Sequence, residues 1–263
     1  MSALNELIED SGGRIIRYAL VVLVLGGAAF LLWNANWRTI AGLDFSAVWT
    51  YRNALFYGLW VTAVLTVVAA IFGLLAGTLL AIGSQSPLAP LRWVIVAFVE
   101  IFRDTPMLVQ LMWIHFALPM LTGINTSPVV SGVICIALHA SAYFTELMRG
   151  GIQAVPRSQW EASYALGIPA WTRWTRVVLP QALRIALPPL VSLVISFFKA
   201  TAILSVLQVG ELMSVASRIS NATFRPIEIF SVVALVYFVI GYVMSRGGLL
   251  LEKRLGRGAG HAR

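Results

Sequence analysis

Long apolar runs make up most of the chain, and short polar stretches separate them. Most of these runs reach the roughly 17–25 residues that a helix needs to cross a bilayer. Backbone groups in lipid must be paired within the protein, and the alternation of a membrane β-barrel is absent, so the pattern predicts helices. We predict an all-α, polytopic membrane protein with about six transmembrane helices, at residues 15–33, 54–82, 91–120, 129–148, 185–209 and 227–244.

Three further features of these runs bear on the fold. The first run follows an acidic start, unlike the basic start of a secretory signal, so we expect a retained helix. The runs at 54–82 and 91–120 exceed the length of one span, so part of each is expected to tilt or to lie along the interface. Pro188 and Pro189 remove two backbone donors, which predicts a broken helix that lines a cavity.

Composition and charge agree with a membrane protein. Hydrophobic residues make up 59% of the chain and charged residues only 11%, whereas soluble domains carry about 25% charged residues. The formal net charge of +8 does not point to nucleic acid, because the basic residues lie between and at the ends of the apolar runs. We therefore expect the lipid bilayer, and no nucleic acid, as a partner.

The basic residues also predict the orientation. With the N-terminus inside, most of the 19 Lys and Arg residues fall on the inner side, and the outer side holds Arg38, Arg52, Arg218 and Arg225. Cytoplasmic loops carry an excess of Lys and Arg, so both termini are expected in the cytoplasm. The expected parts are an N-terminal segment with the first helix and outer loop, a membrane core with one long inner loop, and a cytoplasmic tail, at residues 1–53, 54–251 (loop 149–184) and 252–263.

The long inner loop carries the clearest local signals. Ser158 followed by Glu161 fits a capping box, in which each side chain bonds the other's backbone N–H where a helix begins. Gly167 suits the left-handed residue that ends a helix. Pro169 suits the first turn of a second helix, and Pro180 is expected to end that helix. We therefore predict two short helices joined at a glycine turn.

Two interpretations of this loop are open from its residues alone. Trp160 and Tyr164 share one face of the first helix, and the small residues Ala162, Ser163 and Ala165 leave room for close approach. The aromatic and basic content suits an interfacial helix that rests on lipid. The same composition suits an element that docks onto a soluble partner.

A resemblance to a known family favours the docking element. The loop resembles the EAA loop of the transmembrane subunits of ABC importers, with the matching residues Glu161-Ala162-Ser163, Gly167 and Leu179-Pro180. Other stretches are similar to signatures of the polar amino acid permease family, at residues 102–110, 143–152, 179–190 and 199–202. Asp104 stands in place of the family's glycine, and Ala200 in place of its aspartate.

The resemblance implies a type I ABC importer permease fold with a cytoplasmic coupling helix, in a bacterial inner membrane. It implies a polar amino acid as cargo, and as partners a pair of ATPase subunits, a second permease subunit of the same or similar sequence, and an extracytoplasmic solute-binding protein. The residues implied to couple to the ATPase are Ser158, Trp160, Glu161, Ala162, Ser163, Ala165 and Gly167. Neither Lys199 nor Lys253 follows the glycine that a phosphate-binding loop requires, so ATP and Mg²⁺ are expected in the partner ATPase. We expect no enzyme activity and no cofactor in this chain.

Ionisable residues inside apolar runs are costly and usually face a cavity or a partner. Glu146 lies three residues before Arg149, which favours either an ion pair along the helix or a carboxylate that faces the translocation path. Lys199 is expected to pair either with a substrate carboxylate or with Glu146. The candidate residues of the substrate path are Arg103, Tyr143, Glu146, Lys199 and Thr201.

Two other classes of function fit the residues less well. A secondary transporter driven by an ion gradient would use Glu146 and Lys199 as its relay. A membrane-embedded hydrolase would need a Ser/His or His/Glu constellation, which the sequence does not present. His115 and His139 stand alone on apolar runs and are expected to pack rather than to bind metal, and Cys135 is expected to be a small buried hydrophobe.

Overall fold

The computed structural model describes residues 18–27, 29–30 and 32–256, and this part of the chain is helical without strands. It divides into two compact units, residues 1–44 and 45–263. In the first unit an apolar helix covers residues 18–27, and helix α2 (Trp37–Ala41) begins where the Asn36 side chain accepts a hydrogen bond from the Thr39 N–H. The predicted run at 15–33 begins outside the described residues, and its described part is helical.

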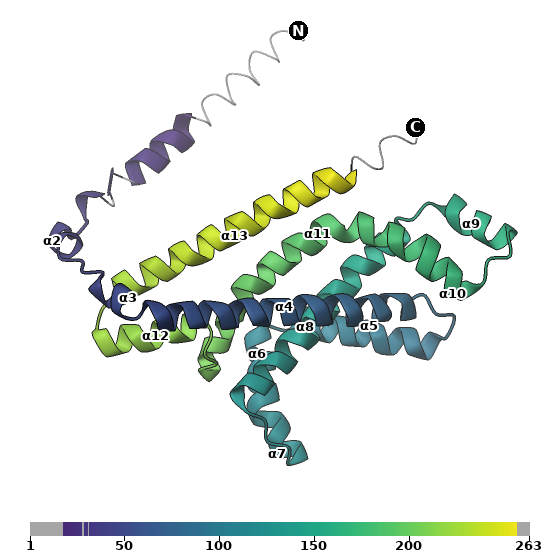
Figure 1. The fold of residues 1–263 in the computed structure, drawn as a ribbon, viewed down its shortest axis with the longest axis horizontal. Helices are drawn as coiled ribbons and strands as arrows, with labels where there is room; N and C mark the ends of the chain where they lie inside the picture. The colour runs from purple at the N-terminus through teal and green to yellow at the C-terminus, as the bar shows by residue number, and fades with distance from the viewer. Residues whose placement is uncertain (1–17, 28, 31, 257–263) are drawn as a thin grey trace, which may run out of the picture. The chain divides into compact units, whose positions relative to one another are not determined.

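The second unit is organised around two long helices. After the short α3 (Ser46–Thr50), α4 (Arg52–Gly83) packs against α8 (Pro128–Gln153), as Figure 1 shows. Glycines on α4 allow this close approach: a Cβ added at Gly77 would lie 2.6 Å from the Phe144 Cβ. Both helices are long and apolar enough to cross a membrane, which confirms the runs predicted at 54–82 and 129–148.

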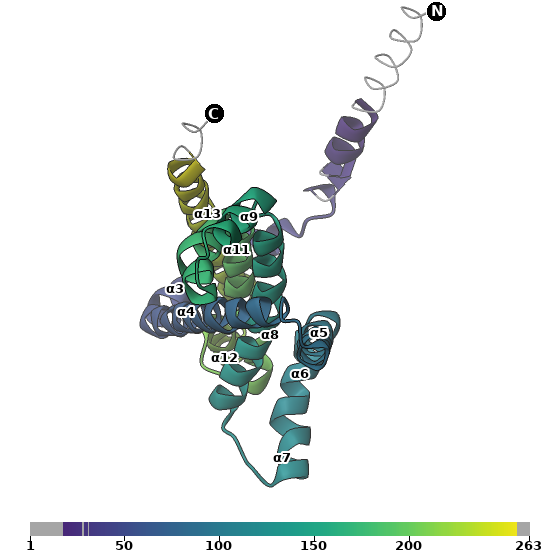
Figure 2. The same cartoon turned by 90° about the vertical axis from the view of Figure 1, so that its right-hand side faces the viewer.

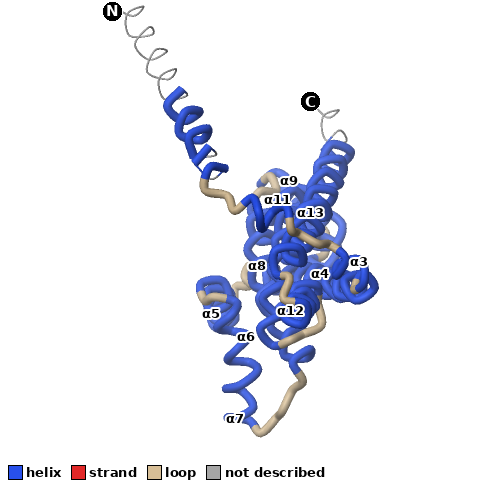
Figure 3. Tube along the Cα trace, turned by 90° about the vertical axis from the view of Figure 1, so that its left-hand side faces the viewer, coloured by secondary structure: helices blue, strands red, loops and turns tan. Residues whose placement is uncertain are grey.

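The third predicted run, at residues 91–120, is not one helix. Helix α5 (Ala89–Asp104) ends at Thr105, which is extended (φ −99°, ψ 140°) because Pro106 follows it. The chain resumes as α6 (Met107–Met112), a π-helical turn η1 (Trp113–Ala117) and α7 (Leu118–Thr122). Figures 2 and 3 show α5 nearly end-on beside α8, while α6 and α7 run away from it. The single helix expected for this run is therefore wrong.

The inner loop and the fifth run form α9 (Arg157–Ala165) and one long helical stretch. That stretch comprises α10 (Ala170–Thr172), a π-helical segment η2 (Arg173–Val178), α11 (Leu179–Ala200) and a 3-10 segment η3 (Thr201–Leu207). It is long and apolar enough to cross a membrane.

Two expectations about prolines in this stretch are wrong. Pro180 does not end the helix: it lies in the first turn of α11, after a widened π turn in which the Leu179 N–H donates to the Trp174 carbonyl. A proline fits such a position, because its missing N–H and fixed φ cost little in a first turn. Pro188 and Pro189 lie inside a continuous α11, since their fixed φ is compatible with a helix even where two bonds are lost. The expected break is therefore wrong, but Pro189 lines a cleft, as predicted for this segment.

The chain closes with two further helices. α12 (Leu212–Thr223) begins at buried Glu211, whose carboxylate accepts the N–H groups of Met213 (2.8 Å) and Ser214 (2.6 Å). The long helix α13 (Pro226–Gly256) packs on α11 and α12 and contains the sixth predicted span. The main apolar core lies among α4, α8 and α11, and a smaller core lies among α3, α12 and α13.

Candidate translocation clefts and coupling loop

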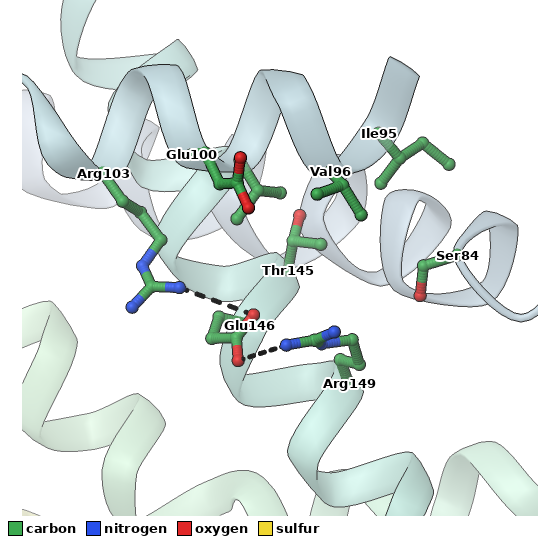
Figure 4. Close-up of a pocket in the computed structure, with 9 residues that line it drawn as sticks. Ser84, Ile95, Val96, Glu100, Arg103, Thr145, Glu146 and Arg149 are labelled. Atoms are coloured by element: carbon green, nitrogen blue, oxygen red, sulfur yellow. Dashed lines mark hydrogen bonds and ion pairs between the residues drawn. The ribbon is translucent and has the colours of Figure 1, made fainter. Parts of the chain in front are cut away.

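A charged cluster lies where α5 meets α8. Glu146 pairs with Arg149 at 2.7 Å, and its other oxygen lies 3.5 Å from the Arg103 guanidinium. Figure 4 shows both arginines converging on this carboxylate from opposite sides, with Glu100 and Thr145 along the same small cleft of about 100 Å³. The ion pair expected along the helix is therefore present, and the same carboxylate also faces a cleft.

Two larger clefts continue this cluster along the line between α8 and α11. One, of about 270 Å³, includes Arg103, Glu146 and Ser192, and the other, of about 190 Å³, includes His139 and Phe197. Their linings share Tyr143, Leu193 and Ser196, so they form one groove. This groove presents a cation, an anion, hydroxyl groups and aromatic faces within one short path.

Tyr143 is the residue that joins the charged end of the groove to its aromatic end. Its hydroxyl donates to the Arg103 carbonyl at 3.4 Å, and the Arg103 guanidinium lies 5.7 Å from its ring centroid. Its ring also lies 5.0 Å from that of His139 and 6.5 Å from that of Phe197. The structure thus brings together three of the five residues named for the path, Arg103, Tyr143 and Glu146.

The other two named residues lie outside the linings of these clefts. Thr201 is fully buried, and its hydroxyl donates to the Phe198 carbonyl. Lys199 is exposed on α11, and the end of its stem lies near Gly241 of α13. In the part of the chain that the structure describes, the basic partners of Glu146 are Arg103 and Arg149, and no ion pair joins Glu146 to Lys199.

A polar clamp that the sequence reasoning missed holds the break between α5 and α6. The Gln110 amide donates to the carbonyls of Phe102 (2.9 Å) and Thr105 (3.1 Å), and its oxygen is hydrogen-bonded to His139 Nδ1 at 3.0 Å. His139 is therefore both a packing residue and part of the groove lining. The other intramembrane histidine, His115, is hydrogen-bonded to Ser131.

Cys135 and the histidines are not gathered into a cluster of possible metal ligands in the described residues. Cys135 is fully buried in the core, as expected of a small hydrophobe. Among residues 18–27, 29–30 and 32–256, no group of three His, Cys, Asp or Glu side chains is placed to hold a metal ion.

The start of α9 differs from the expected capping box. The helix begins after Pro156, which occupies the N-cap position with an extended ψ of 136°, and no side chain makes a capping hydrogen bond there. Ser158 already has helical backbone in the first turn, so it cannot act as the N-cap. The capping box of Ser158 and Glu161 is therefore wrong, because the proline supplies the entry conformation.

The end of α9 confirms the glycine turn. Gly167 has a left-handed φ of +65°. Its N–H donates to the Tyr164 carbonyl, and the Ile168 N–H donates to the Ser163 carbonyl, each at 3.0 Å. These two bonds form a Schellman motif, which satisfies the last carbonyls of the helix.

One face of α9 packs on its own chain. The Trp160 ring meets Trp174 of η2 edge-on at 5.3 Å, and Ser163 is only 2% exposed. Arg173 stacks over Tyr164, with 3.7 Å between its guanidinium carbon and the ring centroid. Of the residues implied in coupling, Trp160 and Ser163 thus hold the helix in place.

The opposite face of α9 is exposed in the part of the chain that the structure describes. Ser158, Glu161, Ala162 and Ala165 are exposed there, as is Gly167 at the turn. An apolar side chain close by, Leu166, is 76% exposed. A short rigid helix with a small, mostly neutral outer face is suited to seat in a complementary cleft of another protein.

Residues 73–257 match the protein family described as binding-protein-dependent transport system inner membrane component. The chain belongs to this family. The permease is 33% identical to the arginine transport system permease protein ArtQ of Bacillus subtilis, over 81% of this chain and 97% of ArtQ. It is 32% identical to the glutamate/aspartate import permease protein GltK of Escherichia coli, over 80% of this chain and 97% of GltK.

Solved structures agree with the sequence relatives. A chain in the crystal structure of an amino acid ABC transporter with histidines superposes with a TM-score of 0.74 and 34% identity, covering 81% of the permease and 99% of that chain. A chain of the MetNI methionine ABC transporter in an inward-facing conformation shares the fold, with a TM-score of 0.68 and 19% identity over 78% of the permease and 98% of that chain.

These comparisons confirm the central predictions from the sequence. The permease has the all-α type I importer fold, and it is an inner-membrane permease subunit of an ABC importer. The ion-gradient transporter is not supported, because the family is one of binding-protein-dependent transport.

Proposed function

We propose that this permease carries a polar amino acid along the groove between α8 and α11. The observation that carries the proposal is the convergence of Arg103, Tyr143 and Glu146 on one short stretch of that groove. The names of the relatives, which include arginine, cystine and glutamate/aspartate systems, support an amino acid as the cargo.

The chemistry of the groove matches a zwitterion. The Arg103 guanidinium offers a charge-assisted hydrogen bond to an α-carboxylate. The Glu146 carboxylate and the face of Tyr143 both attract an α-ammonium group. When the groove is empty, Glu146 pairs with both Arg103 and Arg149. An arriving zwitterion therefore exchanges the Arg103–Glu146 pair for two new pairs, while Arg149 stays paired with Glu146. Binding and release thus leave each of these charges with a partner.

Energy for transport comes from a separate pair of ATPase subunits in this proposal, and these hold the ATP and Mg²⁺. The exposed face of α9, with Ser158, Glu161, Ala162 and Ala165, seats on an ATPase subunit, and the Gly167 turn fixes the angle at which α9 leaves that contact. A second permease subunit completes the path, and an extracytoplasmic binding protein delivers the cargo. The orientation follows the basic residues, with α9 and both chain termini in the cytoplasm.

The groove is tested by transport in proteoliposomes that contain the assembled importer. Glu146→Gln keeps the shape of the side chain and removes its charge, so we expect uptake to fall at least tenfold while basal ATP hydrolysis persists. Asp104→Asn is the matched control, since Asp104 is an exposed neighbour of Arg103 that lines none of these clefts. Normal uptake by Glu146→Gln, or an equal loss in Asp104→Asn, contradicts the proposal.

A further inference from the structure

An apolar groove separate from the translocation clefts lies between the end of α4 and the α10–η2–α11 stretch. It has a volume of about 690 Å³. Leu75 and Leu79 of α4 form one wall, and Trp171, Trp174 and Leu183 form the other. Several of these side chains are open to the surroundings, among them Trp171 (79% exposed) and Leu79 (70% exposed). The groove is therefore an exposed apolar surface of the described residues, beside the coupling loop.

Two arginines border this groove. Arg176 and Arg184 precede and follow Pro180, which lines the groove, by four residues each. Arg176 directly follows Thr175 and Arg184 directly follows Leu183, and both of these residues line the groove, so each arginine is the chain neighbour of a lining residue. Both are exposed, and in the described part of the chain neither makes a hydrogen bond or an ion pair.

Neighbouring arginines are already engaged. Arg173 stacks on Tyr164 and donates to the Ile168 carbonyl at 2.9 Å, and Arg149 pairs with Glu146. Arg176 and Arg184 are thus the arginines of this region whose guanidinium groups have no partner in the described part of the chain. An apolar groove with two uncommitted cations at its edge is complementary to a molecule that has an acyl chain and an anionic headgroup.

We propose that this groove binds an anionic phospholipid, with an acyl chain along the Leu75–Leu79 wall and the phosphate at the edge that carries Arg176 and Arg184. Basic pockets between helices on the cytoplasmic side bind anionic lipid headgroups by this combination of apolar contact and charge. Trp171 and Trp174 suit the same depth, because indole rings prefer the membrane interface. The inference rests on the inner-side placement of the coupling loop and does not depend on the transported solute.

A protein segment is the competing occupant, and the charges disfavour it. A helix seated in the groove would cover Arg176 and Arg184, and burying two guanidinium groups is costly unless the segment supplies acidic partners. A phospholipid brings the matching anion and leaves the rest of its headgroup in water.

The test is lipid retention by the purified importer, measured by native mass spectrometry after equilibration with equal amounts of phosphatidylglycerol and phosphatidylethanolamine. We expect the wild type to retain phosphatidylglycerol preferentially. Each arginine near an anionic headgroup is worth a few-fold in affinity, so Arg176→Gln with Arg184→Gln should lower that preference roughly 30-fold. The double lysine variant, which keeps both charges, should retain it, and added inorganic phosphate should not displace the lipid.

Two further variants test whether lipid binding depends on this groove rather than on the overall positive charge of the protein or on misfolding. Arg246→Gln removes a cation from α13, where the guanidinium is engaged by the Tyr242 hydroxyl at 2.9 Å, and should leave the preference intact. Leu75→Trp fills the groove and should lower retention of both lipids. Equal retention of the two lipids by the wild type, an equal loss in Arg246→Gln, or a cross-link from Leu79→Cys to another subunit instead of lipid overturns the proposal. Loss of transport in any variant bears on the function proposed above and not on this site.

Discussion

The Gly167 turn gives the sharpest single test of the coupling loop. Gly167 has φ +65°, a conformation that costs a residue with a Cβ about 1–2 kcal/mol. A Cβ added at this position meets no atom within 4 Å. The cost of Gly167→Ala is therefore one of backbone conformation alone, with no contribution from a steric clash.

This conformational cost weakens the two Schellman hydrogen bonds that end α9. Relieving the strain requires Gly167 to leave the left-handed region, which breaks the bonds from Gly167 to Tyr164 and from Ile168 to Ser163. A change of 1–2 kcal/mol corresponds to a factor of about 5–30 in the population of the opened turn. We expect hydrogen–deuterium exchange at residues 163–168 to accelerate by that factor in Gly167→Ala, and more in the β-branched Gly167→Val. Gly167→Asn should be milder, because asparagine tolerates this region.

Gly150 supplies the matched control for this prediction. It also has open space around an added Cβ, but it lies inside α8 with ordinary helical backbone. Gly150→Ala should therefore leave the exchange of α9 unchanged and stabilise α8 by about 1 kcal/mol. In the assembled importer, Gly167→Ala and Gly167→Val should lower the ratio of transport to ATP hydrolysis, while the chain still inserts. Wild-type exchange and coupling in Gly167→Val would refute the role assigned to this turn.

Three other residues give independent tests of the fold. Gln208 is exposed and has a left-handed backbone conformation (φ 55°). Gln208→Gly should therefore stabilise the permease by about 1 kcal/mol and raise its midpoint of thermal unfolding in detergent. A lower midpoint would contradict backbone strain at this residue. A Cβ at Gly77 would lie 2.6 Å from the Phe144 Cβ and 2.8 Å from the Thr145 nitrogen, so Gly77→Val should cost about 1–3 kcal/mol by separating α4 from α8, and an unchanged midpoint would argue against their contact. Burial raises the pKa of Glu211, outside the spans, from its ordinary 4.5 to about 7. The contribution of Glu211 to the free energy of unfolding is full below the pKa of the unfolded state and is lost as pH rises through the pKa of the folded state. The free energy of unfolding should therefore fall between about pH 4.5 and 7, and this pH dependence should vanish in Glu211→Gln. A free energy of unfolding that rises over this range contradicts the prediction.

The sequence predicted best the helices that correspond to long apolar runs. The runs at 54–82 and 129–148 are long enough to cross a bilayer, and lipid leaves them no other conformation. The break at Thr105–Pro106 was readable in principle, because a residue before proline avoids the helical region. Apolar residues lie on both sides of this break. A hydropathy pattern therefore shows one continuous run where the structure has two helices.

The candidate site was predicted less completely, because several of its contacts join residues that are far apart in the sequence. Glu146 and Arg149 are three residues apart on one helix, so their ion pair follows from the sequence. The contact of Gln110 with His139 joins side chains 29 residues apart, and no local sequence pattern predicts it. In the same way, only the packing of Trp160 on Trp174 reveals which face of α9 remains free.

The central claim is that the exposed face of α9 seats on an ATPase subunit, and site-directed cross-linking tests it most directly. The chain contains one cysteine, Cys135, which is buried, so introduced cysteines report their own surroundings. In the assembled importer, Ala162→Cys should cross-link to a cysteine in the ATPase subunit in high yield, and Thr122→Cys at the far end of α7 should not. Absence of a cross-link from Ala162→Cys in an importer that still hydrolyses ATP and transports its cargo would contradict the account.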